Sequence, residues 1–562
     1  MKYRNIKLFI PFMLLFFIIS MTSCVNDLNV QPIDPSVIQT FDQDGVFAKI
    51  YASLALTGQQ GAAGNGDVAG IDEGTSAFVR LVWNLNELTT DEAICSWGDP
   101  GIPEMNYNKW SSSHDQVKGL YYRLYFNITL CNRFLTNTTG LTDAKSIKQR
   151  AEARFMRALN YYYLLDMFGN VPFTEVVTLQ NAAPQIKRAD LFAYVDKELA
   201  GCEKDMYQAG ETKPYYRVNV VANWLLRSRL FLNSQVFTGA ATTNTLYMDS
   251  AAIYASKVMD PSSGYTLCPV FRQLFMGDNA GAVDGSGANG STVNLAPNEI
   301  IFPIAQDGIK TKSWGGSEFL IASTRTSSDM PSWGISEGWG GNRARATLVK
   351  KFFPTGATFF TDPRDLTTTL ASSPLKDNRA LLFLGKKILS VSGKDSIVPR
   401  TLNIQSNVFT QGYSVIKFSN LRADGGKTSD TQFADTDIPF MRAAEAYLNY
   451  AEAVTRGGTA VGSYTALSAF NALRIRAGAK LLAATPTLQN IIDERAKEFF
   501  FEGYRRSDLI RFGQYGGSDV TYKWDWKGGD AAGVNFDVHF NIFPIPSTDI
   551  AANPKITQNP GY

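Results

Sequence analysis

Two long stretches of helical periodicity constrain the fold of this 562-residue chain more than any other feature. Between residues 115 and 260, apolar side chains such as Leu124 and Ile128 recur at steps of three and four, which places them on one face of an α-helix. A second stretch, residues 438–512, has the same pattern. The sequence therefore predicts a mainly α-helical protein, with a helical scaffold over about residues 115–260 and 436–515.

A short repeated motif occurs in both stretches. Phe155–Ala158 and Phe440–Ala443 share the sequence FMRA, and both look like helix starts with aromatic and small residues on the packing face. Paired helices of this kind build the superhelical scaffolds of tetratricopeptide-like repeats. No clean period of about 34 residues is present, so a non-repetitive helical bundle remains an open alternative.

The segments outside the helical stretches have a different composition. Glycine, serine and asparagine are frequent over residues 58–74, 278–297 and 314–342. Short extended runs that are expected to pair as small sheets are Glu299–Ile304 and Ala380–Leu384. Because loops held by a rigid scaffold commonly carry binding groups, we expect the ligand-binding face in loop-rich insertions over about residues 57–112 and 261–435.

The first 23 residues have the composition of a bacterial secretion signal. Three basic residues among the first seven precede an apolar run over residues 8–21, which is too short to span a bilayer as a helix. The sequence MTSC then ends at Cys24 and resembles a lipobox, so we expect cleavage before Cys24 and lipidation of that cysteine. An ordinary secretion signal remains the alternative, because Met21 stands where a lipobox usually has Leu. Removing residues 1–23 leaves 51 basic against 52 acidic side chains, so the mature chain is close to neutral.

Composition and motif spacing disfavour most enzyme classes. Only two histidines are present, His114 and His539, which leaves little basis for a zinc cluster or a Ser-His-Asp triad. Glycine-rich dinucleotide and phosphate-binding motifs do not occur, and the cysteines match no metal or redox spacing. The near-neutral charge argues against nucleic acid as a partner. A glycosidase needs only two carboxylates, so glycan hydrolysis remains an alternative.

Tryptophan is the residue type whose placement bears most directly on function. Seven of the nine tryptophans lie in loop-like sequence, and Trp97, Trp314 and Trp339 each have a glycine directly beside them. Glycine neighbours leave an indole face open, and an exposed indole is costly unless it meets a partner. The apolar C–H faces of sugar rings can supply that partner. Packing within the loops or the core remains the alternative for each of these residues.

Eight segments spread along the chain carry a further signal. They are residues 32–35 (PIDP), 41–47 (FDQDGVF), 86–92 (NELTTDE), 306–317 (QDGIKTKSWGGS), 435–453 (DTDIPFMRAAEAYLNYAEA), 502–513 (EGYRRSDLIRFG), 524–529 (WDWKGG) and 543–550 (FPIPSTDI). Together they resemble the SusD/RagB family of outer-membrane lipoproteins, and in particular its starch-binding branch. The resemblance implies a mainly α fold with four tetratricopeptide-like helix pairs, a loop-rich ligand-binding face and minor short strands.

The same resemblance implies how the protein is organised in the cell. A signal peptide, residues 1–23, would precede a single domain over residues 24–562. An acyl anchor at Cys24 would hold this domain on the cell surface at the outer membrane. The implied partner is a SusC-like TonB-dependent transporter, which the lipoprotein caps.

The resemblance also assigns binding residues. In the starch-binding branch an arc of aromatic side chains follows the curve of a helical malto-oligosaccharide, and the matching positions are Trp97, Trp314 and Trp339. The starch-binding branch has Tyr where this chain has Trp314, and either residue offers an aromatic face for stacking. An arginine that hydrogen-bonds sugar hydroxyls falls on Arg80. The family's starch-contacting Asn is absent from the loop after Trp97, where we expect Asp99 to accept the same hydroxyl bonds.

A calcium site is implied as well, although no cofactor is required for binding. Its ligands would be Asp435 and Asp437, with Asp278 or Asp284 as the third. Hard oxygen ligands suit calcium, but two carboxylates ahead of a helix can equally cap that helix.

We therefore expect a non-enzymatic surface lipoprotein that captures starch or malto-oligosaccharide by aromatic stacking and delivers it to a SusC-like TonB-dependent transporter. Each stacked ring contributes little, so a short chain should bind weakly and a long polymer should gain through multiple contacts. The alternatives are a binder of a different glycan, a glycan hydrolase, and a scaffold that contacts only protein.

Overall fold

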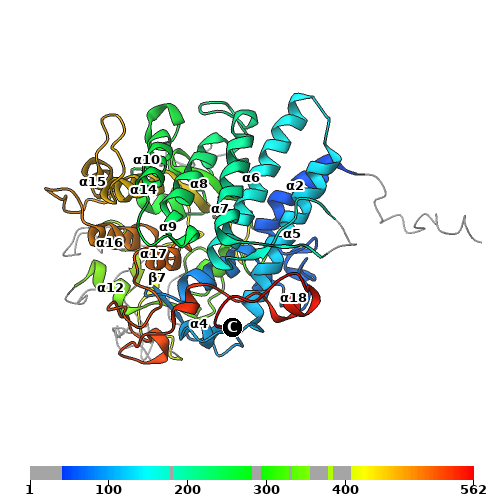
Figure 1. Ribbon diagram of the computed structural model, residues 1–562. Helices are drawn as coiled ribbons and strands as arrows, with labels where there is room; N and C mark the ends of the chain where they lie inside the picture. Colours follow the sequence, from blue (N-terminus) through cyan, green and yellow to red (C-terminus); the bar gives the residue numbers. More distant parts are fainter. Residues whose placement is uncertain (1–40, 178–181, 282–292, 328–331, 355–376, 384–406) are drawn as a thin grey trace, which may run out of the picture. The chain divides into compact units, whose positions relative to one another are not determined.

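Long helices packed side by side form the frame of the protein (Figure 1). The computed structural model describes residues 41–177, 182–281, 293–327, 332–354, 377–383 and 407–562. The helices of the first predicted stretch are α5 (Asp115–Asn137), α6 (Ala144–Met167), α7 (Arg188–Cys202), α8 (Val220–Leu232), α9 (Ser234–Thr238) and α10 (Thr245–Met259). Those of the second stretch are α14 (Ala443–Thr455), α15 (Ala466–Arg476), α16 (Leu488–Phe499) and α17 (Arg505–Arg511). The prediction of a mainly α fold is confirmed.

These helices pack in series, each against the next. Helix α6 lies between α5 and α7, and α10 lies between α8 and α14, which in turn contacts α15 and α16 (Figure 1). Local sequence signals set the ends of α6: the Asp143 side chain accepts a hydrogen bond from Ser146 N, and Gly169 beyond the helix has a φ of +69°. Almost every residue of its second half is buried, because packing covers α6 on more than one side.

The remaining elements are short and lie mostly in the predicted loop-rich segments. The helices are α2 (Gln43–Ala55), α3 (Phe78–Trp83), α4 (Ile102–Asn106), α11 (Ser317–Ala322), α12 (Ala346–Phe352) and α18 (Ser547–Ala552). The strands form antiparallel pairs: β1 (Ala93–Cys95) with β5 (Asn342–Ala344), β2 (Val171–Pro172) with β3 (Gln185–Ile186), β4 (Ile300–Ile304) with β8 (Ile438–Arg442), and β6 (Leu382–Phe383) with β7 (Ser414–Val415). Strands β4 and β6 fall within the two extended runs that the sequence predicts.

Both predicted helix starts are wrong. The first FMRA sequence, Phe155–Ala158, lies in the middle of α6, which begins at Ala144. Residues Ile438–Arg442 form strand β8, so the FMRA sequence that begins at Phe440 does not open a helix until Ala443. Strand β4 supplies the reason, because it pairs with this segment and places Ile304 opposite Ile438. The repeated FMRA motif therefore has a similar sequence but a different structure in the two helical stretches.

The interior contains a network of ion pairs that joins separate elements. Arg442 Nη1 lies 2.8 Å from Glu299 Oε1 and 2.6 Å from Glu498 Oε1, and all three side chains are buried. Arg505 Nε lies 2.6 Å from Asp91 Oδ1, which ties α17 to the segment after α3. Ion pairs of this kind leave an uncompensated charge when one partner is removed, so they fix the register of the elements around them.

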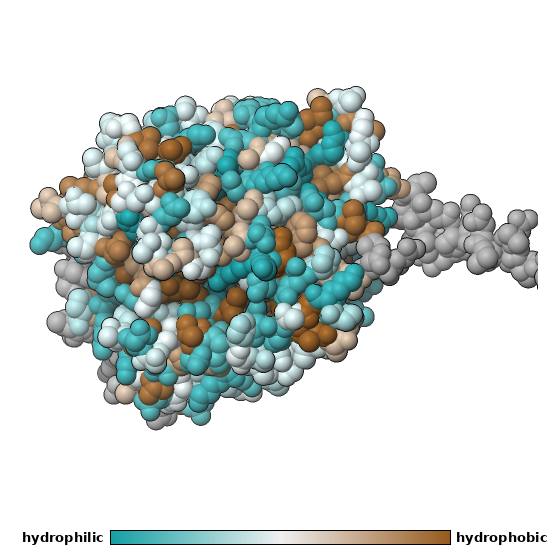
Figure 2. All heavy atoms as spheres, in the orientation of Figure 1, coloured by the Kyte–Doolittle hydropathy of each residue, from teal (hydrophilic) through white to brown (hydrophobic). Residues whose placement is uncertain are grey.

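On the face drawn in Figure 2, hydrophilic and hydrophobic residues are interspersed. Within the described residues, no helix is long and apolar enough to cross a membrane. Residues Asp44–Tyr562 form one compact unit. The predicted signal peptide, residues 1–23, and the lipidation site Cys24 lie outside the described residues and stay predictions.

Candidate functional site

All five predicted binding residues line a single open cleft of about 670 Å³. Trp97 follows β1, Trp314 precedes α11, and Trp339 precedes β5; Arg80 lies on α3 and Asp99 on the loop after Trp97. The cleft is also lined by Gly70, Ile71, Asp72, Thr75, Pro100, Ile102, Asp115 and Gln116. Segments that are far apart in the sequence therefore meet at one place, as the resemblance implies.

The three indoles form a series with Trp339 in the middle. The ring centroids of Trp97 and Trp339 are 6.4 Å apart with an angle of 47° between the planes, and those of Trp314 and Trp339 are 6.0 Å apart at 57°. All three side chains are half-buried. Because each ring is turned relative to the next, together they offer a bent aromatic surface and not a flat one.

Strand pairing and one glycine fix the position of Trp97. Strands β1 and β5 continue into a bond from Ser96 N to Gly341 O of 3.0 Å, which holds the two tryptophan segments together. A Cβ at Gly341 would lie 2.3 Å from the nearest carbon of the Trp97 ring, so only glycine lets the indole rest there. Gly341, two residues after Trp339, thus makes room for the Trp97 ring.

Two of the three indole N–H groups are occupied within the protein. Trp97 Nε1 donates to Trp339 O at 3.2 Å, and Trp339 Nε1 donates to Glu337 Oε2 at 2.8 Å. The Trp314 N–H has no acceptor within the described part of the chain. Ring faces, and one indole N–H, are therefore what the tryptophans offer to a ligand.

Arg80 has unused hydrogen-bonding capacity beside these rings. Its guanidinium carbon lies 5.6 Å from the Trp97 ring centroid and 5.0 Å from that of Phe319, at cation–π distance. Its Nε is buried and, among the described residues, has no hydrogen-bond partner. Burial lowers the pKa of Arg80, and the opposing charges of nearby carboxylates, including Asp99, limit the effect. A buried guanidinium with an unfilled donor calls for an oxygen from water or a ligand.

Carboxylates stand at the rim of the cleft. Asp99 is exposed, and its side chain makes no hydrogen bond to any described residue. Asp72, which no sequence motif singled out, accepts hydrogen bonds at Oδ1 from Thr75 N at 3.1 Å and from Thr75 Oγ1 at 3.2 Å, and its Oδ2 has no hydrogen-bond partner among the described residues. Ionised carboxylates accept hydrogen bonds and cannot donate, so this rim favours ligands that carry hydroxyl groups.

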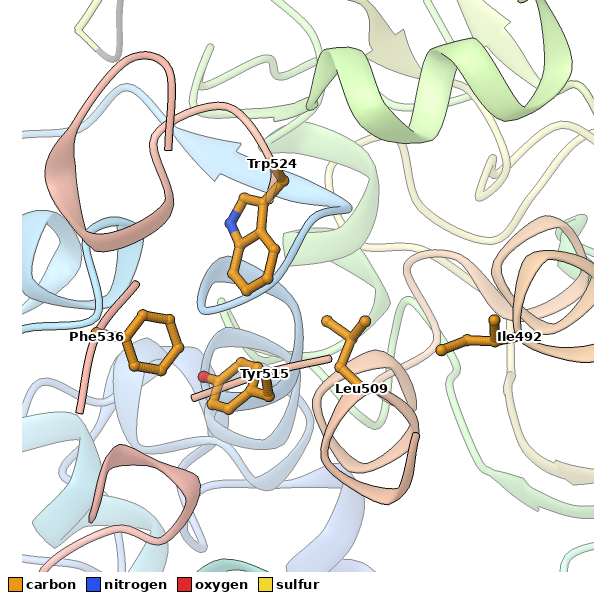
Figure 3. Packing of buried hydrophobic residues seen from close by; sticks show 5 residues of the cluster. All are labelled: Ile492, Leu509, Tyr515, Trp524 and Phe536. Atoms are coloured by element: carbon orange, nitrogen blue, oxygen red, sulfur yellow. The ribbon is translucent and has the colours of Figure 1, made fainter. Parts of the chain in front are cut away.

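The other loop-like tryptophans are mostly packed in the interior. Trp110, Trp333 and Trp524 are buried. Trp524 belongs to a cluster with Tyr515, Phe536, Leu509 and Ile492, in which the Tyr515 and Trp524 ring centroids are 6.1 Å apart (Figure 3). Trp97, Trp314 and Trp339 line the cleft, whereas Trp333, which also has a glycine neighbour, is buried.

The predicted calcium ligands are only partly described. Asp284 lies outside the described residues, and the Asp278 carboxylate accepts from Ala423 N at 3.0 Å and Asn294 Nδ2 at 2.9 Å. Within the described part of the chain, no group of three or more His, Cys, Asp or Glu side chains is arranged to hold a metal ion. Asp437 Oδ2 is nevertheless buried and has no hydrogen-bond partner among the described residues, and burial raises the pKa of this carboxyl well above its usual range. The calcium site stays a prediction.

Comparison with known proteins identifies the class to which this fold and cleft belong. A sequence model described as the SusD family matches residues 392–562. The starch-binding protein SusD of Bacteroides thetaiotaomicron is 41% identical over 566 residues, which cover 96% of each chain. The chain therefore belongs to the SusD family.

Solved structures confirm the fold over nearly the whole chain. Surface glycan-binding protein A from Bacteroides thetaiotaomicron, in complex with laminarihexaose, superposes with a TM-score of 0.66 at 18% identity and covers 92% of this chain and 98% of its own. The protein of the same name from Bacteroides fluxus gives a TM-score of 0.65 at 20% identity and covers 92% of this chain and 99% of its own. At these identities the likeness concerns the fold alone.

Proposed function

We propose that the protein is a non-enzymatic, cell-surface binder of starch and malto-oligosaccharides. The observation that carries the proposal is the bent series of Trp97, Trp339 and Trp314 beside Arg80, whose Nε has no hydrogen-bond partner among the described residues, in one cleft. The 41% identity to a starch-binding protein over 96% of the chain supports this choice of glycan.

The chemistry of such a site is stacking plus hydroxyl recognition. Apolar faces of successive glucose rings lie against the indole faces, and the turn between the rings suits a curved α-glucan better than an extended chain. Arg80 donates to a ring hydroxyl or ether oxygen, while Asp99 accepts from a hydroxyl at the rim. A single short chain gains little from three such contacts. Starch gains more, because many copies of the same curved segment are linked in one polymer.

Anchoring and delivery form the second part of the proposal. Lipidation of Cys24 would hold the protein at the outer membrane, with a SusC-like TonB-dependent transporter as the partner that receives the glycan. Mass spectrometry of the mature N-terminus tests the anchor: an acylated Cys24 supports it, and an unmodified N-terminus elsewhere overturns it. Co-purification of the transporter with the membrane-extracted protein tests the partnership.

A structural calcium ion is the third part. The buried, unpartnered Asp437 Oδ2 fits a cation, and the neighbouring charges of Asp435 and Asp307 add to the negative potential there. Calcium bound by Asp435 and Asp437 would offset the cost of burying these carboxylates. Thermal unfolding with calcium and with a chelator tests this: a higher Tm with calcium supports the site, and an unchanged Tm discards it.

Affinity electrophoresis through gels that contain one polysaccharide each tests the starch assignment. We expect amylopectin to retard the wild-type protein, and laminarin or xyloglucan to retard it less. The triple variant Trp97→Ala/Trp314→Ala/Trp339→Ala should migrate without retardation, whereas the control Trp224→Ala, which removes a half-buried indole of α8, should behave as wild type. Equal retardation of the triple variant would discard the site.

The same preparations decide between the alternatives. Retardation by laminarin or xyloglucan alone would assign a different glycan. Release of reducing sugar from amylopectin by the purified protein would make it a hydrolase. Absence of retardation in every gel would leave a scaffold that contacts only protein.

A further inference from the structure

The middle indole of the cleft is oriented by a side chain outside the cleft. The backbone of Trp339 is fixed by a bond from its N to Ala322 O at 2.8 Å, but Gly338 and Gly340 on either side give the side chain no support. The indole Nε1 donates to Glu337 Oε2 at 2.8 Å, and this bond selects one ring orientation. The orientation of the Trp97 indole depends in turn on Trp339, because Trp97 Nε1 donates to Trp339 O.

Glu337 is itself held from two directions. Its Oε1 accepts a hydrogen bond from Gln432 Nε2, and its backbone O accepts one from the Arg325 guanidinium. With both carboxylate oxygens engaged, Glu337 cannot rotate without breaking a bond to either Trp339 or Gln432. Charge-assisted bonds of this type are stronger than those between neutral groups.

The turn that carries Gln432 also supports the third indole. Asp430 Oδ1 accepts from Gln432 N at 2.7 Å and from Phe433 N at 3.1 Å, which shapes the turn. The Phe433 ring centroid then lies 4.8 Å from that of Trp314. One turn, residues 430–433, thus contacts Trp314 directly and reaches Trp339 through Glu337.

A second buried acid does not compete with Glu337 at neutral pH. Glu318 is buried and neither of its carboxylate oxygens has a hydrogen-bond partner among the described residues. Burial, assisted by the charge of Glu337, raises the pKa of Glu318 to about 9. Glu318 is therefore neutral at neutral pH, and the carboxyl group that accepts the hydrogen bond from the Trp339 indole is that of Glu337.

We propose that Glu337, held by Gln432, is a positioning residue that sets the angle of the Trp339 indole and so the curvature of the aromatic surface. This inference rests on the proposed function, since the curvature matters only if the indoles stack on glucan. Neither side chain lines the cleft, so neither touches the ligand. Both act through the indole.

A double-mutant cycle with maltoheptaose as the probe tests the proposal by calorimetry. Glu337→Ala should weaken binding about threefold to tenfold, the range for one lost intramolecular hydrogen bond. Glu337→Gln keeps an acceptor oxygen and should stay within about twofold of wild type. Trp339→Phe keeps an aromatic face and lacks Nε1. Adding Glu337→Ala to the Trp339→Phe protein should therefore weaken maltoheptaose binding no further.

Two outcomes would overturn the proposal. Glu337→Ala could leave the affinity unchanged, or it could weaken binding equally with Trp339 and with Phe at position 339, which would indicate a general effect of fold or charge. Glu211→Ala removes a carboxylate that pairs with Lys148 outside the cleft and serves as the control. It should bind as wild type.

An NMR measurement separates failure of this inference from failure of the proposed function. In protein labelled with ¹⁵N-tryptophan, the indole N–H signal that disappears in Trp339→Phe belongs to Trp339. That signal should shift and exchange faster with solvent in Glu337→Ala, with no sugar present. An unmoved signal in a protein that binds glucan overturns the positioning role alone, whereas a moved signal in a protein that binds no glucan overturns the proposed function alone.

Discussion

Replacing Arg80 by methionine should separate binding from stability. Methionine keeps a straight apolar side chain of similar length but removes the charge and every donor. In the folded protein the loss of two cation–π contacts, to Trp97 and Phe319, costs about 1 to 2 kcal/mol. Removing a desolvated guanidinium whose Nε has no partner in the described chain stabilises the folded protein by about 1 to 3 kcal/mol. The free energy of unfolding should therefore change by about 2 kcal/mol or less.

Binding should respond much more strongly than stability. A hydrogen bond from a charged donor to a ligand is worth about 1.5 to 3 kcal/mol, so the affinity of Arg80→Met for maltoheptaose should fall about tenfold to a hundredfold. Arg80→Lys retains the charge without the planar set of donors, so its affinity should lie between those of wild type and Arg80→Met. Calorimetry gives the affinities, and urea unfolding gives the stabilities. Unchanged affinity in a folded Arg80→Met protein would refute the assignment of Arg80 as a ligand donor.

Three further predictions concern the packing of the cleft and two buried charged groups of the interior. Gly341→Ala places a methyl group against the Trp97 ring and should weaken glucan binding at least tenfold in a protein that still folds, as measured by affinity electrophoresis; normal retardation would contradict the packing. Burial raises the pKa of Glu92 to about 7 from 4.5, so the folded state binds a proton that the unfolded chain releases, and this contribution to stability is lost as pH rises from about 4.5 to 7. Urea midpoints at pH 5 and pH 8 should show Glu92→Gln gaining on wild type at the higher pH, and a constant difference would contradict this. Arg442→Met removes one of the two arginines, Arg442 and Arg476, that pair with both Glu299 and Glu498, and should lower the free energy of unfolding by about 3 kcal/mol; a loss below about 1 kcal/mol in urea unfolding would refute the role of the Arg442 ion pairs.

Local periodicity predicted the helical frame because the cause of a helix lies within the segment itself. Helices α5 to α10 all lie within the predicted stretch of residues 115–260. Strand β8 escaped prediction because its partner β4 is remote in the sequence, and the residues Ile438–Arg442 suit a helix equally well when taken alone. Tertiary pairing decided between two structures that the local sequence allows.

The candidate site was predictable in its stacking residues and not in their support. Glycine neighbours mark Trp97, Trp314 and Trp339, but Gly334 also follows Trp333, which is buried, so this local signal alone does not separate the cleft from the core. Trp110 also lies in loop-like sequence, yet it is buried 4.8 Å from the ring of Phe543, a contact that only the folded chain creates. The role of Glu337 depends on a bond to a residue in another loop, and no spacing in the sequence reveals it.

The most direct test of the central claim is a crystal structure of the protein with maltoheptaose. The account predicts successive glucose rings against the faces of Trp97, Trp339 and Trp314, with Arg80 donating to a sugar oxygen and Asp99 accepting from a hydroxyl. The chain of the sugar should follow the bend between the indoles. Maltoheptaose bound elsewhere on the protein, with the three indole faces uncovered, would contradict the account.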